Sequence, residues 1–471
     1  MDRNSEKSIL GPRESFRRSV QVSRRHVLEA GTLGLMGLGL GDLLGLQTAS
    51  GADGRSPRPR AKACIFLFMW GGPSHLDTFD LKPQAPDEIR GDFKPIATAV
   101  PGMNICEHFS RVATLTDRLS IVRSLHHTDP AHLSSAHATL TGHWAPVINS
   151  DAEPPSRRDS PQIGSILARL TNKGQGLPPS VTIPWIVSHP AAPGGQAPGQ
   201  NGGWLGKSYD PFVVAGDPNE KNWRVKELSL RGGLSIERLV GRQQLLSHID
   251  QQREAIDRTA EAGELNALQQ QAFSLLASPR ARAAFDLSAE SSHARDRYGR
   301  NVHGQCVLMA RRLVEHGVSL VTVNWHNDGH NFWDTHGNNF NRLKNDLIPP
   351  ADQALSALLE DLDQRGLLEE TLVVWVGEFG RKPIIDKGHA GRAHWPFCYS
   401  GLLAGGGIRG GSIHGASDPH GMHPAQDPVT PLDFAATIYQ SLGIDPHQTI
   451  PNRIGRPVRV SDGEAIADLF G

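Results

Sequence analysis

Short runs of consecutive apolar residues recur along this chain from residue 63 onward. The first run, ACIFLFMW at 63–70, is followed by Gly-Gly-Pro. Strands that are buried on both faces of a parallel sheet have this composition, because neither face presents polar side chains to water. Further runs lie at 119–122, 181–187, 318–325, 371–376 and 397–403. The pattern therefore predicts a set of buried, mostly parallel strands.

Segments with apolar residues at helical spacing alternate with these runs. Residues 351–365 follow a Pro-Pro pair and precede a glycine, which are typical start and stop signals of a helix. Residues 303–316 lead into the run at 318, and residues 431–442 form a third helical pattern. Strands that alternate with helices predict an α/β fold with helices flanking the sheet.

The middle of the chain has a different composition. Residues 188–222 are rich in Pro, Gly and Asn, which is typical of a lid, a binding loop or a disordered segment. Residues 235–275 have a polar, Gln-rich helical pattern. We therefore expect one α/β domain over 60–471 that contains an inserted helical and loop region at about 145–290. No internal repeat is evident.

The first 52 residues have the features of an export signal. Residues 1–28 hold seven basic and three acidic residues, and the stretch at 30–46 has six glycines and a single charge. That stretch is too short and too rich in glycine for a good membrane span. The pair Arg24-Arg25 resembles a twin-arginine signal, and small residues follow at 48–52. We expect export to the periplasm or the medium, with membrane contact only through this signal; an uncleaved anchor is the alternative.

Composition excludes several classes of protein. The 48 basic and 49 acidic residues leave a net charge of -1, which argues against binding to nucleic acid. The hydrophobic content of 38% is too high for a disordered chain and too low for a polytopic membrane protein. The four cysteines form no C-x-x-C pair, which argues against a zinc ribbon, a thioredoxin motif or an iron–sulfur electron carrier. Cys64 and Cys306 are expected to be buried thiols, and a long-range disulfide stays open.

Histidine is unusually frequent, with 22 residues. Thirteen of them fall in three segments, 126–143, 326–336 and 389–423. Clustered histidines are typical of a metal site or an acid/base site, whereas a single histidine is more often a surface or capping residue. Three separate clusters favour the first interpretation.

Several candidate ligands follow the predicted strands, where open parallel sheets bind their ligands. The candidate metal ligands are Asp77, Asp334, His336, Glu378 and His394. Carboxylates and imidazoles suit zinc, and calcium or manganese are the other divalent ions considered. Two such ions about 4 Å apart hold a transferring phosphoryl or sulfuryl group in known two-metal sites. Arg381 is the candidate group for binding the anion.

Each candidate also has a structural interpretation. Asp77, or the nearby Asp80, could cap the turn after the first strand. Asp334 and His336 could tie down a loop, and Glu378 could be the partner of Arg381. The metal interpretation has the advantage that it explains all of these residues together.

Several segments resemble one bacterial family, domain of unknown function 1501. The matching segments are GGPSHLDTFDLKP, LMARRLVEHGVSLVTVNW, WDTHGNNF, VGEFGRKP and GRAHWPFCYSGLLAGGG. The family is grouped with the alkaline phosphatase and sulfatase superfamily, which implies an alkaline-phosphatase-like core. Two more segments, SSAHATLTGH and PVTPLDFAATIYQSLGIDP, are similar to sulfatase segments.

The sequence departs from the superfamily pattern at the reactive positions. The superfamily's metal-binding Asp after the first strand is replaced by Trp70-Gly71-Gly72. The nucleophile position falls on His132, with Ser134 close by, and a formylglycine motif is absent. The superfamily's Asp-His metal pair is Glu378-Phe379 here.

Two hypotheses of function follow. The first is an exported, metal-dependent hydrolase of a phosphate or sulfate ester, with a small molecule or a carbohydrate ester as substrate. In it, His132 or Ser134 is the nucleophile or the acid/base group. The second is a secreted pseudoenzyme of the same fold that binds a ligand or partner without turnover. The sequence does not determine the oligomeric state.

Overall fold

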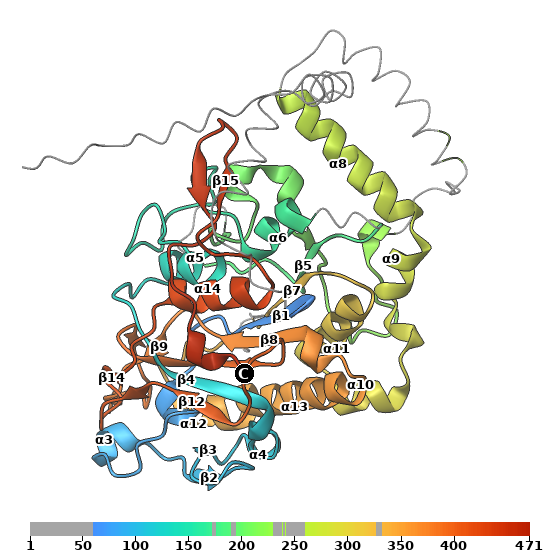
Figure 1. Cartoon of the computed structure of the whole chain (residues 1–471). Coiled ribbons are helices and arrows are strands. Elements are labelled where there is room, and N and C mark those ends of the chain that lie inside the picture. The colour runs from blue at the N-terminus through green and yellow to red at the C-terminus, as the bar shows by residue number, and fades with distance from the viewer. Residues whose placement is uncertain are drawn as a thin grey trace, which may run out of the picture. The chain divides into compact units, whose positions relative to one another are not determined.

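A computed structural model describes residues 60–171, 176–189, 195–228, 238, 241, 260–325 and 332–471 of the chain. The predicted export signal at 1–52 lies outside these residues, as does much of the helical pattern predicted at 235–275. No helix in the described part is both long enough and apolar enough to cross a membrane. The residues described from 60 onward form a central sheet with helices on both faces (Figure 1).

The central sheet has eight strands in the described part of the chain. In spatial order they are β12 (Ser412–His414), β4 (Leu119–Leu125), β11 (Tyr399–Ala404), β8 (Thr371–Val376), β1 (Ala63–Phe68), β7 (Leu320–Asn324), β5 (Ser180–Ile183) and β6 (Phe212–Val213). Strand β11 is antiparallel to β4 and β8, and the other neighbouring pairs are parallel. The predicted fold class, a mostly parallel sheet flanked by helices, is confirmed.

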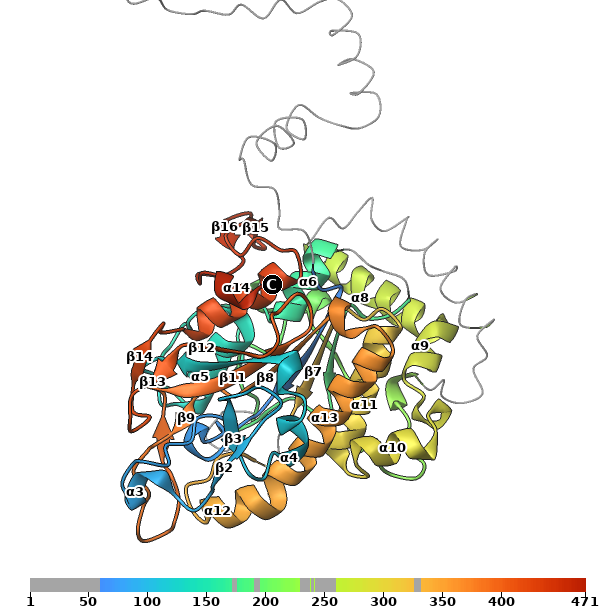
Figure 2. The same ribbon diagram turned by 60° about the horizontal axis from the view of Figure 1, so that its bottom comes forward.

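The apolar runs lack polar positions because the sheet is covered on both faces. One helical layer consists of α5 (His132–Thr141), α6 (Ile163–Thr171) and α14 (Pro431–Ser441), and the other contains α10 (Ser292–Tyr298), α11 (Val302–Glu315) and α13 (Ile348–Gln364). Along β1, Ile65 and Leu67 belong to the core with α11 and α13, whereas Phe66 and Phe68 belong to the core with α5, α6 and α14. Figure 2 shows α11 and α13 lying side by side across their face of the sheet.

The predicted helices are present, with small shifts at their ends. The segments predicted at 303–316, 351–365 and 431–442 form α11, α13 and α14. Helix α13 begins at Ile348, before the Pro-Pro pair, because proline fits the first turn of a helix, where its missing N–H leaves no hydrogen bond unmade. Helix α14 begins with a capping box formed by Thr430 and Asp433.

Part of the region predicted as an insertion belongs to the central sheet. Strand β5 pairs with β7, and β6 pairs with β5 although it lies inside the Pro- and Gly-rich stretch at 188–222. A strand of two residues is too short to show a period in the sequence. Helices α8 (Ala260–Ala277) and α9 (Pro279–Ala284) follow later in the same region.

Shorter elements extend the loops around the sheet. They are α3 (Asp87–Arg90), α4 (Ser110–Ala113) and α12 (Asn339–Arg342), with the two-stranded pairs β2 (Pro95–Ala97) with β3 (Asn104–Cys106), β9 (Gly380–Arg381) with β10 (His394–Trp395), β13 (Ala416–Ser417) with β14 (Pro424–Gln426) and β15 (Thr449–Pro451) with β16 (Pro457–Arg459). The four cysteines are all buried and free, so the disulfide that the sequence left open is not formed.

Candidate metal centre

A cluster of histidines and carboxylates lies where the central parallel strands end. Glu378 follows β8, Asp334 comes from the segment after β7, and His132 is the first residue of α5, which follows β4. His394 is the first residue of β10 and lies opposite Arg381 of β9. Because β4, β7 and β8 run in the same direction, their carboxyl ends lie at one edge of the sheet. Residues far apart in the sequence are brought together there.

Three side chains form a compact set of possible metal ligands. His132, Asp334 and His394 each offer one ligand atom, and these atoms lie within 4.8 Å of one another. The Nε2 atom of His132 is 3.4 Å from Oδ2 of Asp334, and the Nε2 atom of His394 is 3.4 Å from Oδ1. The other ring nitrogen of His394 is 2.8 Å from the carbonyl oxygen of Pro130, which orients the ring.

His336 lies at the outer side of this set. Its Nε2 atom is 3.1 Å from Oδ1 of Asp334 and 2.8 Å from Nε2 of His394. Its side chain is 52% exposed, whereas that of Asp334 is 16% exposed. His336 is therefore the most exposed member of the cluster.

Asp334 is surrounded by positive and hydrogen-bonding groups. Burial alone would raise the pKa of its carboxyl group. The Arg381 guanidinium, followed by the imidazoles of His132, His336 and His394, holds that pKa far below its usual range. Asp334 is therefore an ionised carboxylate, as a metal ligand must be.

His132 is buried between two carboxylates. Its Nδ1 atom lies 2.6 Å from Oε1 of Glu378, on the side of the ring away from Asp334. Burial lowers the pKa of His132, but the carboxylates of Asp334 and Glu378 raise it to about 9. Burial lowers the pKa of His394, although Asp334 opposes that effect. In the metal-free protein, His132 is therefore charged at neutral pH.

The cluster fits a divalent ion by its donor atoms and their spacing. Nε2 of His132 is buried and makes no hydrogen bond of normal geometry to any described residue. Ligand atoms in a tetrahedral zinc site, with bonds of 2.0–2.1 Å, are roughly 3.4 Å apart. The separations of 3.4 Å from Oδ2 of Asp334 to His132 and from Oδ1 of Asp334 to His394 are close to that spacing, and one ligand atom from each of the three residues lies within 4.8 Å of the other two. The donor atoms therefore suit a zinc-like ion, whose binding would draw these side chains closer together.

Glu378 and Arg381 are both fully buried and both hold the backbone of Gly71. The Gly71 N–H donates to Oε1 and Oε2 of Glu378 at 2.9 and 3.2 Å. The Arg381 guanidinium donates to the carbonyl oxygens of Gly71 and Gly72 and forms an ion pair with Asp334. Arg381 is thus bound to protein groups inside the fold, and its contacts are not with Glu378.

Asp77 has a different set of partners. Its two carboxylate oxygens accept from Arg392 at 2.7 and 3.1 Å, and Oδ2 also accepts from Ser74 and Asn339. Asp77 and Arg392 are both completely buried. A buried carboxylate whose two oxygens both accept hydrogen bonds from one arginine typically has a structural role. The structure does not bring Asp77 into the group formed by His132, Asp334 and His394.

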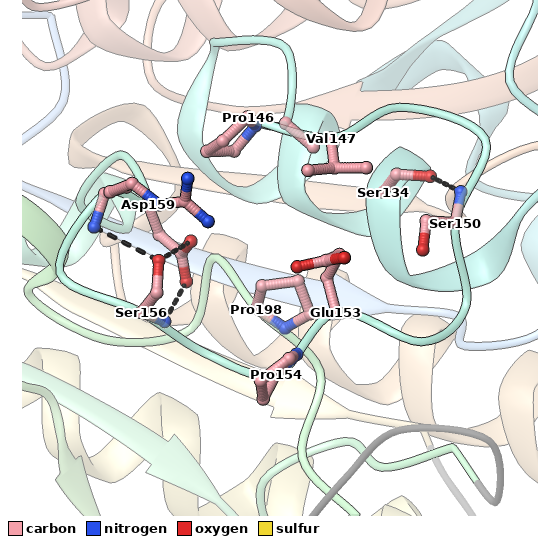
Figure 3. A pocket seen from close by; sticks show the side chains of 11 residues that line it. Ser134, Pro146, Val147, Ser150, Glu153, Pro154, Ser156, Asp159 and Pro198 are labelled. Carbon is pink, nitrogen blue, oxygen red and sulfur yellow. Dashed lines mark hydrogen bonds between the residues drawn. The ribbon is translucent and has the colours of Figure 1, made fainter.

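Ser134 points away from the cluster. Ser134 comes two positions after His132 in α5, and two positions correspond to a rotation of about 200° around the axis of an α-helix. The two side chains therefore lie on opposite sides of α5. The Ser134 hydroxyl accepts from the N–H of Ser150 at 3.2 Å. Figure 3 shows Ser134 beside Ser150 and Val147, among the side chains that line a pocket. The pocket has a volume of about 20 Å³. That volume holds about one water molecule and is too small for an ester substrate.

Other residues of the site were not among the sequence-based candidates. The ring of His189 lies 5.5 Å from that of His132, and Phe379 lies 4.8 Å from His132 and 4.7 Å from His394. His189 comes shortly after β5. The candidate ligands were chosen from residues that follow predicted strands. His189 would have been among them if the residues after the run at 181–187 had been included. Phe379 entered the sequence analysis only as the replacement of a superfamily metal-binding histidine, because a phenylalanine supplies no ligand atom and is usually a core residue.

The sequence and fold were compared with those of known proteins. No curated protein matches the chain. Among solved structures, a sulfatase from Pseudoalteromonas sp. is similar with a TM-score of 0.34 and 14% identity, covering 85% of this chain and 70% of that one. A phosphonate monoester hydrolase from Silicibacter pomeroyi has a TM-score of 0.34 and 14% identity, covering 87% and 76%. Similarities at this level carry no conclusion about activity or ligands.

The family model for proteins of unknown function named DUF1501 matches residues 61–470. This match extends over nearly all of the described residues and confirms the family expected from the motifs. The chain is therefore a member of the DUF1501 family.

Proposed function

We propose that this protein is a metal-dependent hydrolase that acts on a phosphate or sulfate ester. The observation that carries the proposal is the convergence of His132, Asp334 and His394 at the carboxyl edge of the sheet. Two imidazoles and a carboxylate are the ligand set of catalytic zinc, which keeps a further position open for water or substrate. Zinc is favoured over calcium, because calcium prefers oxygen ligands.

The side chains of the cluster have distinct parts in this proposal. A divalent ion bound here would supply Lewis-acid activation of a water molecule and of the ester oxygen. His336, exposed and next to Asp334 and His394, is placed to carry a proton between the site and solvent. Arg381 holds Asp334 in the orientation that faces the two histidines.

Water is the attacking group in this proposal. The superfamily resemblance assigns the nucleophile to position 132, where this chain has a histidine whose two ring nitrogens face Glu378 and Asp334. Ser134 lies on the other side of α5. Among the described residues, the side-chain polar contacts of His132 and Asp334 are with each other and with His336, His394, Glu378 and Arg381, none of which carries a hydroxyl or thiol group.

Export and the substrate class complete the proposal. The pair Arg24-Arg25 and the glycine-rich apolar stretch after it support export through a twin-arginine-type signal. The motif resemblance to the sulfatase and phosphatase superfamily supports a small-molecule or carbohydrate ester as the substrate. A protein exported in the folded state can carry a metal that it acquired before export.

A non-catalytic binding protein is the second candidate, and the charges of the buried groups favour it. Protonated His132 and Arg381 balance the carboxylates of Asp334 and Glu378, so this set of four is neutral without any ion. A buried set with balanced charges can be purely structural. This candidate predicts either no bound metal or a metal whose removal changes stability only.

Metal content distinguishes the two candidates. The protein would be purified after export in its native host, and its metals would be measured by mass spectrometry beside the double variant Asp334→Ala, His336→Ala. About one ion per chain, lost in the variant, supports the hydrolase. Hydrolysis of aryl phosphate, sulfate and phosphonate esters would then be measured. The absence of a stoichiometric metal in both proteins supports the binding protein.

A further inference from the structure

Glu378 lies on the far side of the His132 imidazole from the candidate metal position. Oε1 of Glu378 contacts Nδ1 of His132 at 2.6 Å, whereas Asp334 faces Nε2. An ion bound about 2.1 Å beyond Nε2 would be roughly 6–7 Å from that Glu378 oxygen, because the two nitrogens point to opposite sides of the ring. Glu378 therefore cannot bind the ion while it keeps its contact with His132.

The surroundings of Glu378 hold it in this place. Its carboxylate accepts from the N–H of Gly71, and its backbone carbonyl oxygen is 2.8 Å from Nε2 of His127. Gly71 has a φ of +105°, and a Cβ at this position would approach the backbone nitrogen of Trp333 to 2.8 Å. Only glycine brings the backbone of the residue after Trp70 so close to both segments. The carboxylate is thus fixed between Gly71 and His132.

We propose that Glu378 is a positioning residue that fixes the orientation and tautomer of His132 for metal binding. By accepting a hydrogen bond from Nδ1–H, Glu378 keeps that proton on Nδ1 and leaves the lone pair of His132 on Nε2, which faces Asp334 and His394. This inference rests on the proposed function only in requiring that the cluster binds a divalent ion. The sequence suggested that Glu378 is itself a metal ligand, whereas here Glu378 orients the metal ligand His132.

The chemistry of metal sites supports this part. Histidine ligands commonly donate their second N–H to a carboxylate, and loss of that partner weakens metal affinity by about 10–100-fold. The acceptor is buried, so no water molecule would readily replace it. The ligands themselves would be unchanged when Glu378 is replaced.

The test uses the full-length exported protein with Zn²⁺ and Co²⁺ as probes. The variant Glu378→Gln keeps the shape of the side chain and removes its charge. Its matched control is Glu370→Gln, which alters an exposed glutamate that precedes β8 and pairs with Lys62 at the surface. Zinc affinity would be measured by competition with a chelator, and coordination by the visible absorption of bound Co²⁺.

We expect Glu378→Gln to weaken zinc binding by about 10–100-fold. The Co²⁺ spectrum should keep the band intensities of the wild type, since no ligand is lost. Glu370→Gln should leave both unchanged. Affinity within about twofold of the wild type, or a Co²⁺ spectrum with a different coordination number, would overturn the inference and leave the proposed metal site standing. A wild-type protein that binds no ion would overturn the proposed function itself.

A second measurement does not depend on whether the variant folds. Anomalous diffraction from zinc-soaked crystals of the wild-type protein would locate the ion directly. An ion bonded to Nε2 of His132, with Glu378 still in contact with Nδ1, supports the inference. An ion bonded to Glu378 contradicts it.

Discussion

The Nε2 atoms of His336 and His394 lie 2.8 Å apart. Both nitrogens also face the same oxygen of Asp334, at 3.1 and 3.4 Å. Two protonated imidazoles would repel each other at this distance, so at least one of the two nitrogens must present a lone pair. The pair is therefore arranged either for a shared proton or for a shared ion.

The two histidines should contribute unequally to metal binding. His394 is largely buried and is oriented by the carbonyl of Pro130, whereas His336 is half exposed. We expect His394→Ala to weaken zinc binding by at least about 100-fold and His336→Ala by about tenfold or less, because a preorganised ligand loses less entropy on binding. Competition with a chelator measures both affinities. Equal losses in the two variants would contradict this ranking.

Metal affinity should rise with pH. The ion needs the neutral form of His132, whose pKa in the metal-free protein is about 9. Below that pH, each unit of decrease should weaken binding by about tenfold, and one proton should be released per ion bound. Calorimetry in buffers of different ionisation enthalpy counts this proton. An affinity that does not change between pH 6 and 9 would rule out His132 as a ligand.

The stability of the metal-free protein should fall at alkaline pH. The pKa of His132 is raised in the folded state to about 9, above its unfolded value of about 6.5. Its contribution is therefore complete below pH 6.5 and is lost as the pH rises through 9. The loss amounts to about 3 kcal/mol. Denaturant unfolding at pH 6.5 and pH 9.5, with a chelator present, measures it, and the variant His132→Gln should lack this part of the pH dependence.

Asp77 should matter for stability and not for metal content. Asp77→Asn would leave Arg392 buried without its charged partner, which typically costs about 3–5 kcal/mol. Thermal unfolding should show this loss, and the metal content of the folded fraction should match that of the wild type. Asp334→Asn is the opposite case, because it should remove the metal. Loss of metal in Asp77→Asn at unchanged stability would restore Asp77 as a candidate ligand.

The N-terminal arginine pair should direct export. A twin-arginine signal depends on both arginines, so the variant Arg24→Lys, Arg25→Lys should keep the precursor inside the cell. Cell fractionation with detection of precursor and mature forms measures this. Replacement of Arg17 and Arg18 by lysine is the matched control and should leave export unchanged. Equal export of both variants would contradict the predicted signal.

The layered fold follows from the pattern of apolar residues along the chain. Apolar runs without alternation could only be strands covered on both faces, and β1, β4, β7 and β8 lie where those runs predicted. The helical patterns at 303–316, 351–365 and 431–442 predicted α11, α13 and α14, and a Pro-Pro pair marked the start of α13. The direction of β11 was not encoded in this way, because a buried antiparallel strand and a buried parallel strand have the same composition.

The grouping of the candidate residues into one site became clear from the folded chain alone. The sequence rule placed Asp77, Asp334 and Glu378 equally at strand ends, and the structure joins Asp334 to His132 and His394 and turns Asp77 toward Arg392. The rule predicts which residues lie near the end of a strand, but it does not predict which of them come within a few ångströms of one another. The direction of each side chain depends on its partners, such as Gly71 for Glu378, and those partners are distant in the sequence.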